Sequence, residues 1–258
     1  MKPLLSLTAP PPSGEIVLCS VIIPRRLAPS LTARLRAALS DEECARHARF
    51  GDDGAAGEFL CGRALLRAVL STWASVDQHA WRFALNAYGR PSIDAPPSPL
   101  HFNLSHTRGM VVLVLGVDPS VGVDVERLDR SVRPLEVADR FFSTREVDGL
   151  RALPVEQHRD RFLALWTLKE AYIKARGMGL ALPLRDFSFS PDDAPPRVHF
   201  EASLGDDSRL WRFARIDLPS GHRVAVAAKV SRMRVHHEAL DLDTLAEHVG
   251  LPGTVPAV

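Results

Sequence analysis

A strict alternation of apolar and polar residues runs through positions 121–126, which read Val-Gly-Val-Asp-Val-Glu. A period of two residues is typical of a β-strand with one buried face. The valines therefore point towards a core, and Asp124 and Glu126 share the opposite face with Cα atoms about 6.6 Å apart. Two carboxylates this close repel each other unless a cation lies between them. A Mg²⁺ site is one interpretation, and an acidic pair on a solvated strand face is the alternative.

Positions 166–175 predict a helix, because they contain no Gly or Pro and Gly177 follows as a stop signal. Trp166, Glu170 and Lys174 recur every four residues, which places them along one face. A Glu–Lys pair at this spacing is ordinary on an exposed helix, but the tryptophan indicates that the face is packed at one end. Together with the acidic strand, a third carboxylate and a lysine would form a site for a metal ion and a phosphate.

The rest of the chain alternates between apolar runs and helical patterns. Capping-box patterns at Ser40 and Ser143 each open a helix. Strands are expected at 15–23, 102–104, 110–115, 187–190, 198–202, 210–216 and 224–230. Helices are expected at 29–39, 40–50, 59–73, from 143 onward and at 154–176, and a turn is expected at 87–91.

The order of strand, helices and strands occurs twice, which indicates two halves. A natural boundary lies near Gly116 and gives an N-terminal half at 15–117 and a C-terminal half at 118–232. The remaining residues, 233–258, form an extension in which 241–249 predicts a short helix of unknown purpose.

Composition agrees with a globular protein of the cytoplasm. A hydrophobic content of 46% argues against disorder, and a net charge of +1 gives no reason to expect nucleic-acid or membrane binding. The three cysteines lack CxxC spacing, which is typical of reduced thiols rather than of disulfides or zinc ligands. The first fourteen residues lack a signal-peptide pattern, and no apolar run approaches the length of a membrane span.

Three short motifs, taken in order, resemble those of the Sfp-type 4′-phosphopantetheinyl transferases. They are N-x-S-H within 101–107, G-x-D-x-E within 121–126, and W-x-x-K-E-A-x-x-K over 166–174. Segments 141–143 and 179–183 also fit the family pattern. Each motif alone would be weak, but the three in this order are specific, and the resemblance extends over about 15–230.

The resemblance implies an α+β fold of two similar halves related by a pseudo-twofold axis, with the active site at their interface. It implies an enzyme that depends on Mg²⁺ and transfers the 4′-phosphopantetheine arm of coenzyme A to a serine of an apo acyl- or peptidyl-carrier protein, with release of 3′,5′-ADP. A monomer and a role in secondary metabolite biosynthesis are expected. Whether the carrier belongs to a fatty-acid, polyketide or peptide synthase stays open.

The resemblance also assigns roles to residues. Asp124, Glu126 and Glu170 would be the metal ligands, and Glu170 would act as base on the serine, directly or through water. Lys174 would lie against the transferring phosphate. The residues expected to bind coenzyme A are Lys174, Ser105, His106, Arg46 and Arg90, the last of which replaces the lysine of a Gly-Lys-Pro element.

Two positions depart from the family pattern. Glu43 and Glu58 stand where basic residues usually hold the nucleotide 3′-phosphate. Arg46, Arg49 and Arg63 are nearby candidates to replace those basic residues. Two other functions remain open: a Mg²⁺-dependent hydrolase of pyrophosphate bonds and a non-catalytic coenzyme A-binding protein.

A basic segment follows the acidic strand and is expected to dock an acidic carrier. Its alternative interpretation is a helix with a solvated basic face. The residues concerned are Arg127, Arg130, Arg133, Arg140, Phe141 and Phe142.

Overall fold

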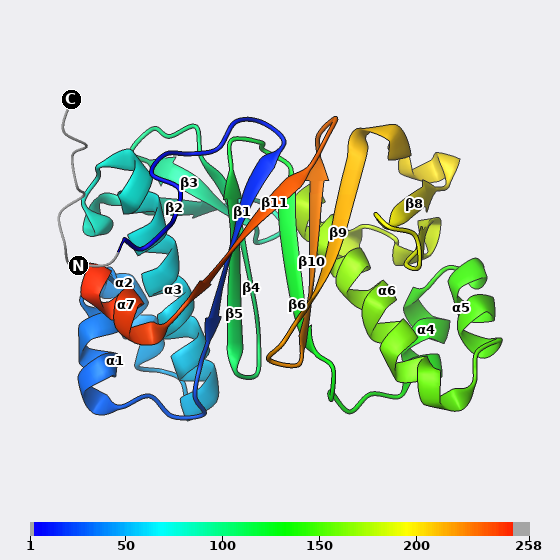
Figure 1. The fold of residues 1–258 in the computed structure, drawn as a ribbon, viewed down its shortest axis with the longest axis horizontal. Coiled ribbons are helices and arrows are strands. Elements are labelled where there is room, and N and C mark those ends of the chain that lie inside the picture. Colours follow the sequence, from blue (N-terminus) through cyan, green and yellow to red (C-terminus); the bar gives the residue numbers. More distant parts are fainter. Residues whose placement is uncertain (1–2, 250–258) are drawn as a thin grey trace.

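Two β-sheets pack against each other at the centre of the molecule, and helices cover the outer face of each sheet (Figure 1). The computed structural model describes residues 3–249. The strand orders are β11-β1-β5-β4 and β6-β10-β9. The strands are β1 (Glu15–Ile22), β4 (His101–Thr107), β5 (Met110–Gly116), β6 (Val121–Arg127), β9 (Trp211–Leu218), β10 (His222–Lys229) and β11 (Arg234–Leu240).

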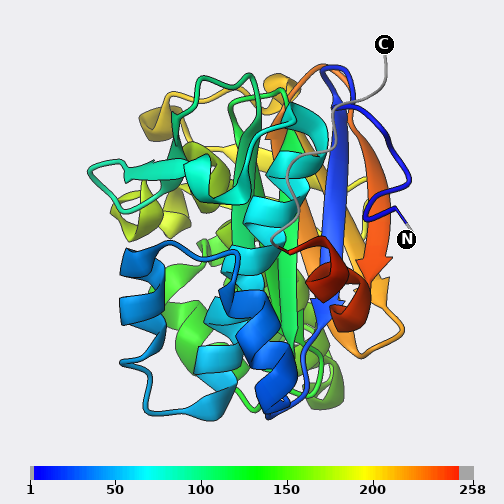
Figure 2. The same ribbon diagram turned by 90° about the vertical axis from the view of Figure 1, so that its left-hand side faces the viewer.

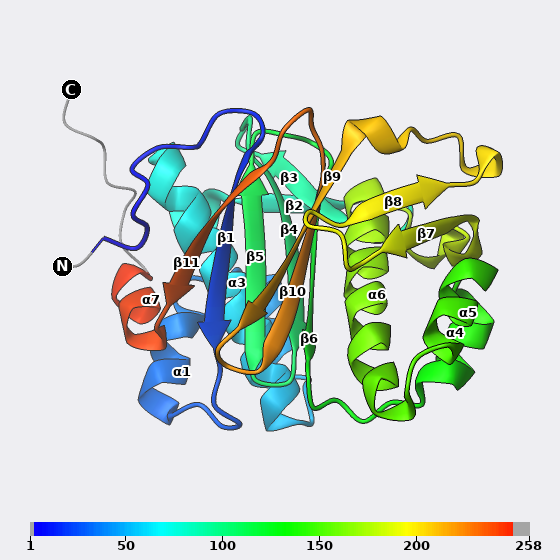
Figure 3. The ribbon, with the colours of Figure 1, turned by 45° about the vertical axis from the view of Figure 1, so that its right-hand side comes forward.

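The helices divide between the two outer faces. The long α3 covers the first sheet together with α1, α2 and α7, and the long α6 covers the second sheet with α4 and α5 outside it (Figure 3). None of the helices within residues 3–249 is long and apolar enough to cross a membrane. Their bounds are α1 (Pro29–Arg36), α2 (Asp41–His47), α3 (Asp53–Ala74), α4 (Pro134–Phe141), α5 (Thr144–Arg151), α6 (Val155–Arg176) and α7 (Leu242–His248).

Alternating residues on the central strands separate three apolar cores. On β1, Val17 and Cys19 face α3, whereas Ile16 and Leu18 face the second sheet. On β6, Val121, Val123 and Val125 meet these residues in the layer between the sheets. The acidic face of β6 therefore points away from that layer and towards α6.

Most of the predicted helices and strands are present, with ends shifted by a few residues. Both capping boxes are confirmed, at Ser40 and at Ser143. α3 begins at Asp53 rather than at 59, because the Asp52 side chain accepts a hydrogen bond from the Ala55 N–H at 2.8 Å and caps the helix earlier. The predicted turn joins a small hairpin, and the two small hairpins are β2 (Arg82–Leu85) with β3 (Pro91–Ala95), and β7 (Phe187–Ser190) with β8 (Arg197–Phe200).

The extension builds onto the first sheet. β11 pairs in parallel with β1, and α7 packs beside α1 and α3 (Figure 2). Leu245 of α7 is fully buried. The predicted helix is confirmed, but the strand before it was not predicted. Its sequence, Arg-Val-His-His-Glu, lacks a clean alternation because its two histidines bind polar groups on β1: His236 lies 2.6 Å from Glu15 and His237 2.8 Å from Ser20. The three-part division of the chain stays a prediction.

A close contact at Gly122 joins β6 to α6. A Cβ atom at this position would lie 2.2 Å from the carbonyl oxygen of Ala171 and 2.4 Å from the nitrogen of Ala175. Both are backbone atoms of α6, so no side-chain movement could relieve the overlap. Only glycine lets the strand and the helix approach this closely.

We therefore expect Gly122→Ala to force β6 and α6 apart and to lower the free energy of unfolding by about 1–3 kcal/mol or more. Gly149→Ala is the matched control. Gly149 lies within α5, and apart from its chain neighbours and the backbone of its own helix, no atom of the described residues lies within 4 Å of its would-be Cβ. The control should be neutral or gain up to about 1 kcal/mol. Urea unfolding of both variants checks this, and equal stability of the two would contradict the role assigned to the contact.

Candidate active site at the seam between the sheets

Two polar side chains of β4 reach across to β6. The Asn103 side-chain oxygen accepts a hydrogen bond from the Val123 N–H at 2.9 Å. The Ser105 hydroxyl donates to Asp124 Oδ1 at 3.0 Å. Both β4 residues are buried, and they join the two sheets where no backbone ladder does. The N-x-S pattern therefore marks the seam between the sheets.

Lys174 closes this seam from α6. Its ammonium group donates to Asp124 Oδ1 at 2.6 Å and to the Ser105 hydroxyl at 2.8 Å. Lys174 keeps 28% of its side chain exposed, so the ammonium lies at the boundary between the core and solvent. Three predicted site residues from three different elements thus meet at one point.

Three carboxyl groups surround this point, and their charges are only partly compensated. Asp124 and Glu126 are both buried, and Glu170 is half-buried. Burial, with the Asp124 charge as the next cause, raises the pKa of Glu126 to about 7. The same two causes, in the same order, raise the pKa of Glu170 to about 7. Arg130 forms an ion pair with Glu126 and offsets part of this repulsion.

The donor chemistry of this group suits a divalent cation. Asp124 Oδ2 is buried and has no hydrogen-bond partner among residues 3–249, and Glu126 and Glu170 hold protons to an unusually high pH. A hard cation takes such carboxylate oxygens and removes their mutual repulsion. Within residues 3–249, however, no three acidic, histidine or cysteine side chains already stand as a ligand set. Lys174 and Arg130 provide the positive charge there.

The other residues expected to bind coenzyme A have partners outside the seam. His106 is half-exposed, and its Nδ1 lies 2.9 Å from a Glu58 carboxylate oxygen. Arg46 is exposed, with its guanidinium 5.0 Å from the centre of the Phe59 ring. Their roles towards a ligand stay predictions.

Arg90 has three backbone partners. Its guanidinium donates to the carbonyl oxygens of Ala175 at 2.7 Å, Pro119 at 3.1 Å and Val121 at 3.1 Å. Burial lowers the pKa of this group. Arg90 thus ties the β2–β3 turn to the end of α6 and the start of β6, a structural role that the sequence did not indicate. Its predicted contact with coenzyme A stays a prediction.

The departure at Glu43 has a structural explanation. Its carboxylate caps α2, forms an ion pair with Arg63 and accepts from Arg67 Nε at 2.8 Å. The arginine charges pull its pKa down against the effect of burial, which alone would raise it. Arg63, one of the replacements suggested for the 3′-phosphate site, is therefore already neutralised.

The basic segment after β6 is largely paired with acids. Arg127 binds Asp129, Arg130 binds Glu126 and Arg133 binds Glu136. The prediction that Phe142 helps dock a carrier is wrong, because this ring is buried and stacks on Phe162 with centroids 5.3 Å apart.

Lys169 is a residue whose role the sequence did not reveal. It stands one position before Glu170, and its ammonium is fully buried, with Glu146 at 2.8 Å and carbonyl oxygens of Leu184 and Phe187 at 2.8 and 2.6 Å. The two lysines of the W-x-x-K-E-A-x-x-K motif therefore differ: Lys169 joins α6 to α5 and β7, and Lys174 belongs to the seam.

Residues 120–227 match the family model described as the 4′-phosphopantetheinyl transferase superfamily. The chain is 35% identical over 214 residues to the 4′-phosphopantetheinyl transferase Sfp of Bacillus subtilis (strain 168), covering 81% of this chain and 90% of that protein. Another Bacillus subtilis 4′-phosphopantetheinyl transferase is 33% identical over 202 residues, covering 78% and 81%. The 4′-phosphopantetheinyl transferase HetI of Nostoc sp. is 38% identical over 150 residues, covering 57% and 63%.

Replacement of Lys169 should mainly lower stability, whereas replacement of Lys174 should mainly lower activity. Lys169→Met leaves the buried Glu146 carboxylate without its cation, which typically costs about 3–5 kcal/mol. Lys174→Met removes a partly exposed cation and should cost less stability, while it removes the charge at the seam. Thermal unfolding compares the two variants. A smaller loss for Lys169→Met than for Lys174→Met would overturn these assignments.

Proposed function

The chain belongs to the 4′-phosphopantetheinyl transferase superfamily, and from this membership we propose that it transfers the 4′-phosphopantetheine arm of coenzyme A to a serine of an apo acyl- or peptidyl-carrier protein. The observation that carries the proposal is the seam, where Ser105 and Lys174 meet Asp124 with Glu126 and Glu170 beside them. A cation and several carboxyl groups around one partly open point suit the handling of a pyrophosphate.

In this proposal the serine oxygen of the carrier attacks the β-phosphorus of coenzyme A. The new O–P bond forms as the bond from that phosphorus to the bridging oxygen breaks, and 3′,5′-ADP leaves with the bridging oxygen. Lys174 donates hydrogen bonds to the phosphate oxygens, where charge accumulates in the transition state. The Ser105 hydroxyl helps to orient the same group.

Glu170 is the base in this proposal and takes the proton of the serine hydroxyl, directly or through water. In the metal-free protein its pKa is raised to about 7, near the pH at which a base works best, and a bound cation would lower that pKa. Lys174, one turn further along α6, holds the phosphate within reach of the same carboxylate.

A divalent cation, which we propose to be Mg²⁺, would be held by Asp124, Glu126 and Glu170. When bound, such an ion supplies Lewis-acid stabilisation of pyrophosphate charge. The unpartnered oxygen of Asp124 and the raised pKa values of both glutamates support this assignment.

We also propose that the two halves are related by a pseudo-twofold axis with the active site between them. The support is that each half packs one 22-residue helix, α3 or α6, on the outer face of its sheet. Ser105 comes from the first sheet and Asp124 from the second.

Asp124→Asn and Glu170→Gln should each lower the rate of transfer at least about 100-fold, the usual contribution of a group that acts on the transferring proton or charge. Both proteins should remain folded, because each change removes a carboxylate from a repelling set. The assay incubates the protein with coenzyme A, Mg²⁺ and a panel of apo carrier proteins and then weighs the carriers. Hydrolysis of coenzyme A at the same rate without a carrier would favour the hydrolase instead.

Mg²⁺ should raise the melting temperature more at pH 8 than at pH 5. The pKa values of Glu126 and Glu170 are raised to about 7 in the folded state, so at pH 5 both groups keep their protons and compete with the metal. Without Mg²⁺, the stability linked to these protons is complete below about pH 4.5 and is lost as pH rises through about 7.

Glu170→Gln is the control for this measurement. The variant should show a smaller Mg²⁺ shift, and a weaker fall in metal-free stability between pH 4.5 and 8 than the wild type. A Mg²⁺ shift that is the same at both pH values, or unchanged in the variant, would contradict the proposed ligands.

A further inference from the structure

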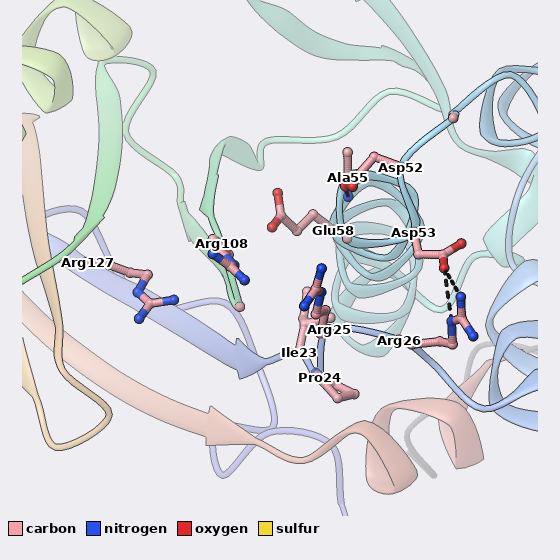
Figure 4. Close-up of a pocket in the computed structure, with 13 residues that line it drawn as sticks. Ile23, Pro24, Arg25, Arg26, Asp52, Asp53, Ala55, Glu58, Arg108 and Arg127 are labelled. Atoms are coloured by element: carbon pink, nitrogen blue, oxygen red, sulfur yellow. Dashed lines mark hydrogen bonds and ion pairs between the residues drawn. The ribbon is translucent and has the colours of Figure 1, made fainter. Parts of the chain in front are cut away.

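A cleft of about 1070 Å³ opens at the end of the two sheets where β1 and β6 finish (Figure 4). Its walls are the residues after β1, the β4–β5 turn, the first turn of α3 and the end of β6. Both sheets therefore contribute to it. The charged residues that line it are Arg25, Arg26, Arg108, Arg127, Asp52, Asp53 and Glu58.

Most of these charges already have partners. Arg26 pairs with Asp53 at 2.7 Å, and Arg127 pairs with Asp129, which lies outside the cleft lining. Glu58 faces His106, and the Asp52 side chain caps α3.

Arg25 and Arg108 are the two lining arginines left without an ion pair within residues 3–249, and both are exposed. Their side chains turn into the same opening (Figure 4). Two free guanidinium groups on one opening favour a carboxylate-bearing ligand, because the planar fork of arginine matches a carboxylate.

An exposed apolar residue directly precedes the residues that line the cleft. Ile22, the last residue of β1, is 61% exposed and pairs with Met110 beside the turn that holds Arg108. Arginine is enriched at protein–protein interfaces relative to the rest of the surface, so the two unpaired arginines suit a protein partner.

The cleft lies close to the seam. Arg108 follows Ser105 by three residues, which corresponds to about 10 Å of extended chain, and Arg127 follows Glu126 directly. On an α-helix, about 10 Å corresponds to roughly two turns. If a helix of a partner protein places its serine in the seam, the side chains one or two turns away from that serine lie over Arg108.

We propose that this cleft, through Arg25 and Arg108, docks the carrier protein, and that the carrier presents acidic side chains one to two helical turns from its acceptor serine. The inference rests on the proposed function and assigns a docking surface to it. It shares Arg127 with the surface predicted from the basic segment after β6 but rests on other arginines, because Arg127, Arg130 and Arg133 are already paired.

The test uses the full chain and the apo carrier that the wild type modifies fastest in the panel described above. Arg25→Glu and Arg108→Glu should each raise the KM for the carrier about tenfold or more, whereas the KM for coenzyme A should change less than twofold. Raising the salt concentration should raise the carrier KM of the wild type and alter that of the variants less.

Arg232→Glu is the matched control. Arg232 is exposed and lies beside Gly14, at the opposite end of β1 from the cleft, so the same charge reversal there should leave the carrier KM unchanged. Arg25→Ala and Arg108→Ala replace the reversals if a reversed variant melts below the assay temperature. A carrier with lysine in place of an acidic residue one or two turns from its serine should restore activity with Arg108→Glu.

Each outcome decides the matter. A carrier KM that stays at the wild-type value in the cleft variants, or rises equally in Arg232→Glu, overturns the docking surface while transfer itself stands. An equal rise in the KM for coenzyme A assigns the arginines to the coenzyme and also overturns it. If the wild type modifies no carrier at all, the proposed function fails and the docking proposal fails with it.

Discussion

The approach of one strand to one helix determines where the charges of this protein meet. Gly122 lets β6 lie against the backbone of α6 at Ala171 and Ala175. Two residues further along the strand, Asp124 then falls beside Lys174. The glycine of the G-x-D-x-E pattern is therefore as necessary to the site as its acids, although it carries no chemistry. A wider spacing between the strand and the helix would leave the carboxylates on one element and the lysine out of reach on the other.

The same contact explains why so many acids can be tolerated near a core. Asp124, Glu126 and Glu170 share one small region, and burial of three ionised carboxylates together would be strongly unfavourable. The protein offsets this cost with two cations, Lys174 and Arg130, and with raised pKa values that keep part of the charge as protons. The result is a region whose carboxylates favour added positive charge, and the proposed cation site depends on this property.

The sequence predicted the local features of this arrangement well. Some features depend only on neighbours within a few residues of the chain, so they can be predicted from the sequence alone. They are the alternation at 121–126, the helix at 155–176 and both capping boxes. Features that depend on distant segments were not predicted. Lys169 resembles a surface residue until Glu146 is known to lie beside it, and β11 lacks a clear alternation because its histidines bind polar groups on β1. The three carbonyl partners of Arg90 also lie far away in the chain, so its structural role was not predicted.

The pairing of β1 with β11 has a consequence for the order in which the protein can be made. β1 lies near the start of the chain and β11 near the end of the described residues, yet they are neighbours in one sheet. During synthesis, β1 can pair with β5 on one side, but its other edge stays open until residue 240 has left the ribosome. An open strand edge is a template for wrong pairing, and contacts between distant segments form slowly. The sheet of the first half therefore keeps an unpaired edge at β1 while the later residues, which include those of the active site, are synthesised and fold.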